Sequence, residues 1–124
     1  NVYGGRENCE GEFATVIAKF LERKKQNKIL QITSPGTQSR NFTYIDDTIS
    51  ALHLIADKGN GDEYGIANPK SYTINEVAKL ISDKVEYINE NSANRMNSDV
   101  LIDKTCSLGW APQTELSDYL KSKE

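Results

Sequence analysis

Residues 28–47 read KILQITSPGTQSRNFTYIDD and contain the elements that decide the fold. Residues 28–33 alternate weakly between polar and apolar side chains, which predicts a strand closed by the turn at 34–36. Residues 41–45 are rich in aromatic and β-branched side chains and predict a second strand. The unit is therefore a strand, a Pro-Gly turn and a returning strand, and Arg40 lies where the chain re-enters the sheet.

Helices on both sides of this unit follow from the apolar periodicity. Upstream, a helix is expected over about 12–26, with an apolar stripe of Phe13, Val16, Ile17, Phe20 and Leu21. Downstream, Asp46 or Asp47 is expected to cap a helix that Gly59 ends. The inner face of this second helix is expected to comprise Ile49, Leu52 and Ala56.

The rest of the chain continues the alternation of helices and strands. Thr73 and Glu76 form a capping-box pattern that starts a helix, whose buried side chains are expected to be Val77, Leu80, Ile81 and Val85. The remaining expected elements are short: strands at 64–67 and 87–88, and helices over about 99–108 and 115–122. This order predicts one α/β domain of mixed α+β topology over residues 1–124.

Composition excludes several classes of protein. Hydrophobic residues make up 37% of the chain and charged residues 27%, which is typical of a soluble folded domain. The net charge of −3 argues against non-specific nucleic-acid binding. No apolar run approaches the roughly 20 residues that span a bilayer, and no signal peptide opens the chain. Two distant cysteines, Cys9 and Cys106, indicate reduced thiols and a cytoplasmic location.

Few residues could carry chemistry. With one histidine, His53, and two distant cysteines, no metal site and no Ser or Cys nucleophile with a nearby base is predicted. Asp46 and Asp47 suit a helix start better than acid–base work, because adjacent residues of a helix do not face each other. Arg40 offers a planar fork of donors for a phosphate, and the alternative is a surface arginine paired with a carboxylate. We assign no catalytic, metal-binding or cofactor-binding residue within the chain.

Five weak motifs follow one another along the chain. They are the Asn-Val-Tyr-Gly start at 1–4, the stretch at 39–47, Tyr64–Asn68, Tyr72–Ala78 and the Leu-Gly-Trp-x-Pro segment at 108–112. In this order they resemble the C-terminal half of the NAD-dependent epimerase/dehydratase family. These are extended short-chain dehydrogenases that act on nucleotide sugars, with UDP-glucose 4-epimerase as the best-known member. The resemblance implies a small substrate-binding domain of helices and short strands that lacks the Rossmann domain.

The resemblance also implies which residues hold the substrate. Asn1 matches a residue that contacts the diphosphate or sugar, and Arg40 one that reaches the diphosphate and ribose. A second diphosphate arginine is matched by Arg95. The strand beside the nucleotide base is matched by Leu30, Gln31, Ile32 and Thr33. At Gly5 the chain departs from the family, which usually has proline there.

The family's catalytic parts are not in these 124 residues. The glycine-rich NAD loop and the Tyr-x-x-x-Lys pair belong to the family's N-terminal Rossmann domain, and no such loop occurs here. Tyr119 has Lys123 at the right spacing, but in a polar C-terminal tail where the family places no catalysis. The chain alone is therefore expected to bind no NAD and to be inactive.

We accordingly expect the UDP-sugar-binding portion of an NAD-dependent epimerase or dehydratase. The start at Asn1, with no Met, suggests a fragment that has a Rossmann domain as its partner. Such a fragment is expected to expose an apolar docking surface, with Tyr3 and the inner faces of the first helices as candidates, and to be prone to self-association. Two alternatives stay open: a stand-alone nucleotide-sugar-binding module without chemistry, and a structural or interaction domain.

Overall fold

A computed structural model describes residues 1–89 and 100–123. The chain forms two compact units, and it passes between them more than once. The first unit comprises Asn1–Val2, Asn41–Ser71 and Asp99–Glu124. The second comprises Tyr3–Arg40 and Tyr72–Ser98.

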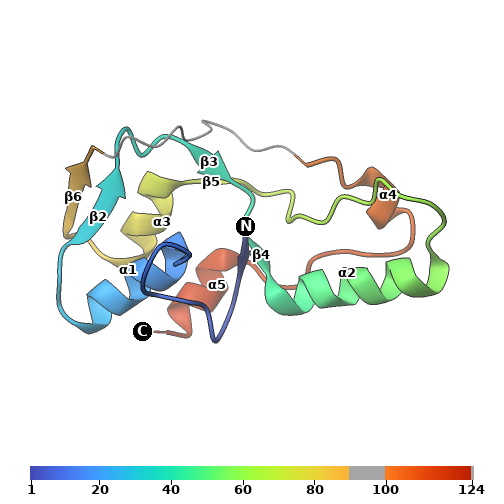
Figure 1. The fold of residues 1–124 in the computed structure, drawn as a ribbon, viewed down its shortest axis with the longest axis horizontal. Helices are drawn as coiled ribbons and strands as arrows, with labels where there is room; N and C mark the ends of the chain where they lie inside the picture. Colours follow the sequence, from blue (N-terminus) through green and yellow to red (C-terminus); the bar gives the residue numbers. More distant parts are fainter. Residues whose placement is uncertain (90–99, 124) are drawn as a thin grey trace. The chain divides into compact units, whose positions relative to one another are not determined.

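The second unit is built on a parallel pair of strands. β2 (Leu30–Thr33) and β6 (Val85–Ile88) lie side by side in register, with Leu30 opposite Val85. Helices α1 (Val16–Lys25) and α3 (Ile74–Ile81) pack on β2 and on each other (Figure 1). The core of this unit is formed by the buried side chains of Ile17, Phe20, Leu30, Ile32, Val77, Ala78 and Ile81.

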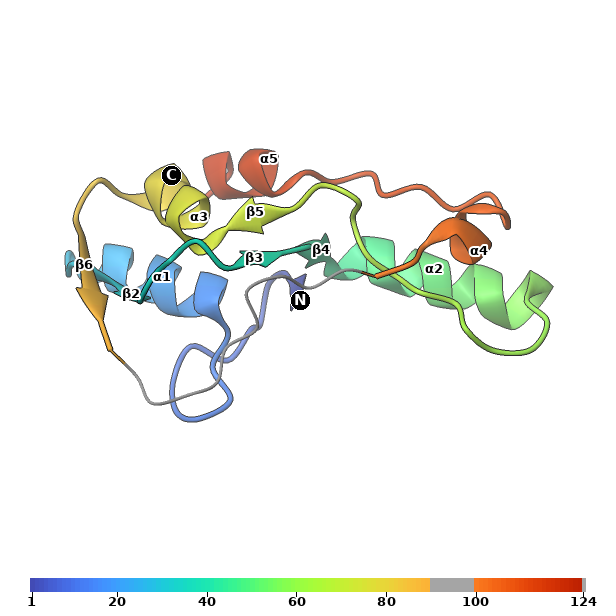
Figure 2. The same ribbon diagram turned by 90° about the horizontal axis from the view of Figure 1, so that it is seen from above.

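A second, antiparallel strand pair lies in the same unit. β3 (Ser39–Arg40) pairs with β5 (Tyr72–Thr73), which leads directly into α3, and both views of the ribbon show the two strands side by side (Figure 2). The predicted capping box at this junction is confirmed. Thr73 Oγ1 accepts the main-chain N–H of Glu76 at 3.1 Å, and Glu76 Oε1 accepts that of Thr73 at 3.1 Å.

Three side chains that were expected on the apolar faces of this unit are exposed instead. Phe13 was expected on the stripe of the first helix, but α1 begins only at Val16 and the Phe13 side chain is 82% exposed. Thr15 occupies the N-cap position, yet its hydroxyl donates to the Glu7 carboxylate at 2.8 Å instead of capping the helix.

On α3, Leu80 is exposed although it was expected to be buried. On β6, Val85 is 36% exposed, although it was also expected to be buried. The reverse holds for Tyr3, which was expected on an exposed docking surface and is 1% exposed.

The first unit contains one long helix and several short elements. α2 (Ile45–Lys58) is preceded by β4 (Thr43–Tyr44). β4 pairs with β1 (Val2–Tyr3), of which Val2 belongs to this unit. α4 (Asp103–Cys106) and α5 (Leu116–Lys121) are shorter than the helices expected over 99–108 and 115–122.

The strand expected at 64–67 is not formed. The segment is irregular, and its Gly65 carbonyl accepts the hydroxyl of Thr105, which is completely buried. The strand expected at 41–45 is likewise shorter, since only β4 forms there and β3 precedes it.

The start and the orientation of α2 also differ from expectation. Its N-cap is Tyr44, with no side-chain cap, so Asp46 and Asp47 lie in the first turn and cap nothing. Ala51 and Asp47 are the buried residues of the helix, whereas the residues expected to face inward, Ile49, Leu52 and Ala56, are exposed. Gly59 ends the helix as predicted.

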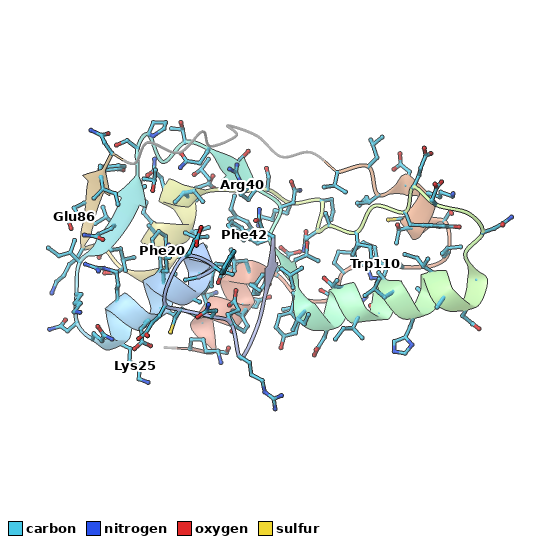
Figure 3. The ribbon with its side chains drawn as sticks, viewed as in Figure 1. Phe20, Lys25, Arg40, Phe42, Glu86 and Trp110 are labelled. Atoms are coloured by element: carbon cyan, nitrogen blue, oxygen red, sulfur yellow. The ribbon has the colours of Figure 1, made fainter. Side chains whose placement is uncertain are left out.

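Contacts to the C-terminal segment explain this orientation. The buried Asp47 carboxylate accepts the main-chain N–H of Gln113 at 3.0 Å and that of Thr114 at 3.1 Å. Trp110 lies beside α2 and donates its indole N–H to the Asp47 carbonyl oxygen at 3.0 Å (Figure 3). A charged carboxylate must stay hydrogen-bonded when it is buried. These bonds therefore turn the Asp47 side of the helix inward.

Candidate functional site

The strand β2 presents two different faces. Leu30 and Ile32 are 0% and 1% exposed, because their side chains pack into the core. The side chains of Gln31 and Thr33 point to the opposite face, since successive residues of a strand alternate. Of the four residues expected beside a nucleotide base, only Gln31 and Thr33 offer side chains on the outer face.

The backbone of β2 is open along one edge. Leu30 donates its N–H to the Lys84 carbonyl and Ser34 donates to the Ile88 carbonyl, both at 2.9 Å, so the even-numbered residues bond to β6. In a parallel pair the alternate residues direct their N–H and C=O groups away from the partner strand. No other strand of the described residues pairs with β2. The N–H and C=O of Gln31 therefore lie at an edge that can accept a planar group with its own donors and acceptors.

The outer face of this sheet carries a polar pair. Gln31 Nε2 donates to Glu86 Oε1 at 3.0 Å, and both side chains are exposed. Glu86 lies on the outer strand β6 (Figure 3). The exposed face of this sheet thus offers a ligand polar side chains that form hydrogen bonds, while the opposite face packs into the apolar core.

Gln38 is a residue of the site that the sequence-based reasoning missed. Its side chain is only 4% exposed, and Nε2 donates to the Thr33 carbonyl oxygen at 3.0 Å, at the end of β2. Its own carbonyl accepts the N–H of Ile74 at 3.1 Å. Gln38 therefore connects the end of β2 to the start of α3 and holds the turn between them. The available signal was its position two residues before Arg40, which places both side chains on one side of an extended segment.

Arg40 follows on β3 and is half-buried. It stands opposite Tyr72 in the antiparallel pair, and Nη1 donates to the Ser39 carbonyl oxygen at 2.7 Å (Figure 3). No acidic side chain within residues 1–89 and 100–123 forms an ion pair with it. A guanidinium has five N–H donors, so most of its donor capacity is available to a ligand.

The other predicted substrate residues lie elsewhere. Asn1 belongs to the first unit, where its carbonyl oxygen accepts the N–H of Thr43 at 2.9 Å. Arg95 lies outside the described residues. The structure therefore brings the β2 residues together with Gln38 and Arg40 in the second unit.

Residues dismissed from the sequence have structural roles or exposed positions. The ring of Tyr119 is buried 5.6 Å from that of Tyr44, and Lys123 Nζ lies 5.2 Å from the centroid of the Tyr119 ring. His53 is exposed on α2, as expected. Within the described ranges no group of His, Cys, Asp and Glu could hold a metal ion. In the same ranges no helix combines the length and the apolar character required to cross a bilayer.

Comparison with known protein families identifies the relatives of this chain. The model described as the NAD dependent epimerase/dehydratase family matches residues 1–68, which is more than half of the chain. The chain belongs to this family. The predicted family and the predicted mixed helix-and-strand fold of an extended short-chain dehydrogenase are thereby confirmed.

Individual relatives cover the whole chain. It is 28% identical over 131 residues to UDP-glucuronic acid decarboxylase 5 of Arabidopsis thaliana. This alignment covers 100% of this chain and 38% of the decarboxylase. It is 29% identical over 135 residues to human dTDP-D-glucose 4,6-dehydratase, with 98% of this chain and 37% of the relative covered.

Solved structures show the same relationship. UDP-glucose 4-epimerase of Thermotoga maritima, solved with UDP-glucose, is 29% identical with a TM-score of 0.88. The match covers 98% of this chain and 41% of the epimerase chain. UDP-N-acetylglucosamine 4-epimerase of Methanobrevibacter ruminantium, solved with UDP-N-acetylmuramic acid, is 26% identical with a TM-score of 0.89. The match covers 99% of this chain and 42% of the epimerase chain. The chain thus spans about two fifths of the length of these relatives.

Proposed function

We propose that this chain is the nucleotide-sugar-binding portion of an NAD-dependent epimerase or dehydratase. The observation that carries the proposal is the open edge of β2, at whose end Gln38 connects to Thr33 and the half-buried Arg40 follows. Family membership and the UDP-sugars named in the solved relatives support it.

The edge of β2 suits a pyrimidine base. Uracil presents a ring N–H next to carbonyl oxygens, and the backbone C=O and N–H of Gln31 are the complementary groups. An exposed strand edge binds through such main-chain hydrogen bonds, and neighbouring side chains add specificity. Gln31 and Thr33 supply the side chains on this outer face, while Leu30 and Ile32 hold the strand in the core.

Arg40 suits the diphosphate. A nucleotide diphosphate carries about two negative charges, which an arginine fork binds bidentately and without a metal ion. A surface arginine paired with a carboxylate was the alternative, and the described residues offer Arg40 no such carboxylate. Asn1 and Arg95 stay predicted as further contacts to the diphosphate or sugar.

The described residues contain no helix start of the dinucleotide-binding type. Dinucleotide sites place a glycine-rich turn between a strand and the N-terminus of a helix. The three longest helices of the described residues begin after Thr15, Tyr44 and Thr73, and none of these starts follows that pattern. We therefore propose that NAD and the catalytic Tyr-Lys pair belong to the remainder of the family fold and that this chain alone performs no reaction.

A titration followed by amide NMR tests the proposal. Adding UDP to millimolar concentration is expected to shift the resonances of Gln31, Thr33 and Arg40. The Arg40→Gln variant is expected to weaken binding at least about tenfold, the value of one charged hydrogen bond. Arg6→Gln, which removes an exposed arginine of the same unit, is the matched control and should leave the affinity unchanged. Shifts confined to other residues, or equal affinity of the Arg40→Gln variant, would contradict the proposal.

A further inference from the structure

The loop that follows α2 carries the one Asn-Gly pair of the chain. Asn60 and Gly61 come directly after the end of the helix, and both are exposed. Figure 1 and Figure 2 show α4 beside this loop, within the same unit. Within the described residues, neither the side-chain amide of Asn60 nor the main-chain N–H of Gly61 forms a hydrogen bond. Both groups are therefore open to reaction.

An asparagine side chain can react with the main-chain nitrogen of the residue that follows it. After this nitrogen loses its proton to solvent, it bonds to Cγ, the Cγ–Nδ2 bond breaks, and ammonia leaves with a proton from solvent. The product is a cyclic imide, which water opens at either carbonyl carbon. Opening at Cγ gives aspartate, whereas opening at the α-carbonyl gives isoaspartate, in which the main chain runs through the side chain. Glycine hinders ring closure least, because it has no Cβ.

The surroundings of Gly61 leave room for this ring. Gly61 has φ +81°, and among the described residues the atom that an added Cβ would approach is Lys104 Nζ, at 4.0 Å. Other asparagines are less suited to the reaction. Asn68 precedes a proline, whose nitrogen has no proton to lose, and Asn75 lies within α3 and precedes a glutamate.

Two hydrogen-bond donors face the main-chain carbonyl oxygen of Asn60. Lys104 Nζ and the Tyr64 hydroxyl each lie 3.4 Å from this oxygen. The ammonium group is held there by the Asp62 carbonyl and by the Tyr64 ring, whose centroid lies 4.3 Å away. The Tyr64 hydroxyl is fixed in turn by the N–H of Asn60, at 2.8 Å. Donors that are already placed at an oxygen stabilise the negative charge that develops on it, so these groups favour attack of water at the α-carbonyl.

We propose that Asn60 is a deamidation site and that Lys104 and Tyr64 direct its imide to isoaspartate. Opening at the α-carbonyl frees an α-carboxylate beside the ammonium and hydroxyl groups that now contact the carbonyl oxygen. The product therefore replaces a contact to a neutral carbonyl with an ion pair between the loop and α4. The same carboxylate is the group that an isoaspartyl methyltransferase esterifies with S-adenosylmethionine, which defines the chemistry of a partner enzyme.

Ageing of the folded chain in mildly alkaline buffer tests the site. Peptide mass spectrometry follows the loss of the side-chain amide, because a hydroxyl replaces the amino group. Asn60 is expected to lose its amide before Asn8, which is also exposed but precedes a cysteine. Asn60→Gln is the matched control and should keep its amide, because its longer side chain would have to close a larger ring. Retention of the Asn60 amide while Asn8 converts would overturn the proposal.

The ratio of isoaspartate to aspartate tests the two donors, with methylation by isoaspartyl methyltransferase as the readout for isoaspartate. Two unit charges about 4 Å apart in water attract with an energy that corresponds to about a fivefold change in a rate constant. The ratio in the folded chain should therefore exceed that of the same chain unfolded in urea by about fivefold. Lys104→Met and Tyr64→Phe should each lower it towards the unfolded value, whereas Lys104→Arg, which keeps the charge, should preserve it.

Lys121→Met removes another exposed lysine of the same unit and is the control for Lys104→Met. Equal ratios in the folded and unfolded chain, or in these two variants, would overturn the role of Lys104. The proposal is independent of nucleotide-sugar binding, because Arg40 and β2 belong to the other unit. Asn60→Gln should accordingly leave the affinity for UDP unchanged.

Discussion

The side-chain amide of Gln38 donates to the main-chain carbonyl oxygen of Thr33 at 3.0 Å. Thr33 ends β2, and Gln38 lies two residues before Arg40, so this bond sets the distance between the strand edge and the guanidinium-bearing strand β3. Its Oε1 is buried and has no hydrogen-bond partner among the described residues. The side-chain N–H of Gln38, and not its side-chain oxygen, therefore makes the hydrogen bond that connects it to β2.

Gln38→Glu is expected to destabilise the second unit strongly. The substitution removes the donor and puts a carboxylate against the Thr33 carbonyl in a buried position. At pH 7 the free energy of unfolding should fall by about 2–3 kcal/mol, measured by urea denaturation. Gln26→Glu is the matched control, because Gln26 is exposed and bonds only to Glu22 on its own helix; it should cost no more than about 0.5 kcal/mol. Equal stability of the two variants would show that the bond to Thr33 contributes nothing.

Asp47→Asn should loosen the attachment of the C-terminal segment to α2. Both carboxylate oxygens of Asp47 accept main-chain N–H groups, and an amide can replace only one acceptor. The expected loss is about 1–3 kcal/mol in the free energy of unfolding. Asp46→Asn removes the same charge from the same helical turn, but its side chain is exposed, so it isolates the contribution of the helix dipole. Losses of the same size in both variants would refute the role given to the two hydrogen bonds.

Gly36→Ala tests the turn between β2 and β3. Gly36 has φ +80°, and an added Cβ would collide with the side chains of Asn75 and Ile32. The backbone conformation and the collision together are expected to cost at least about 2 kcal/mol in thermal or urea unfolding. Gly5→Ala is the control, since no atom lies within 4 Å of its added Cβ and its φ is not in the left-handed region. A stable Gly36→Ala variant would mean that this turn can take another conformation.

Phe20 and Phe13 should respond in opposite ways to truncation. Phe20 is 2% exposed in the core of the second unit, and Phe20→Ala is expected to cost about 3–5 kcal/mol. Phe13 precedes α1 and is largely exposed, so Phe13→Ala should change the free energy of unfolding by no more than about 0.5 kcal/mol. A comparable loss for Phe13→Ala would place it in a core, as the apolar periodicity alone suggested.

Local sequence patterns were sufficient to predict much of the secondary structure of the second unit. The capping box of α3 and the strand β2 depend on residues within a few positions of each other, and both form where the sequence predicts them. The order of short motifs was also sufficient to identify the family, although no single motif is specific. For Arg40 the neighbouring residues left open a phosphate ligand or a surface ion pair, and only the family resemblance favoured the phosphate, which stays a prediction.

Side-chain contacts between distant residues decided the rest. The segment 64–67 was expected as a strand, but it is irregular, and its Gly65 carbonyl bonds to the hydroxyl of Thr105, 40 residues further along the chain. The spacing of Gln38 from Arg40 was the one signal in the sequence, and it was too weak to select Gln38, because the importance of its amide depends on where the Thr33 carbonyl lies after the turn. The site roles of residues 30–33 and of Arg40 came from the family resemblance and stay predictions, whereas the hydrogen bond of Gln38 between them is visible only in the folded chain.

The helix α2 shows most clearly which features the sequence determined and which features only the tertiary structure decided. Its residues by themselves determined that a helix forms and that it ends at Gly59. Periodicity could not determine which apolar side faces inward, because α2 has apolar residues on both sides. The tertiary structure decided this: the Asp47 carboxylate must keep its hydrogen bonds to Gln113 and Thr114 when it is buried, and this leaves Ile49 and Leu52 exposed.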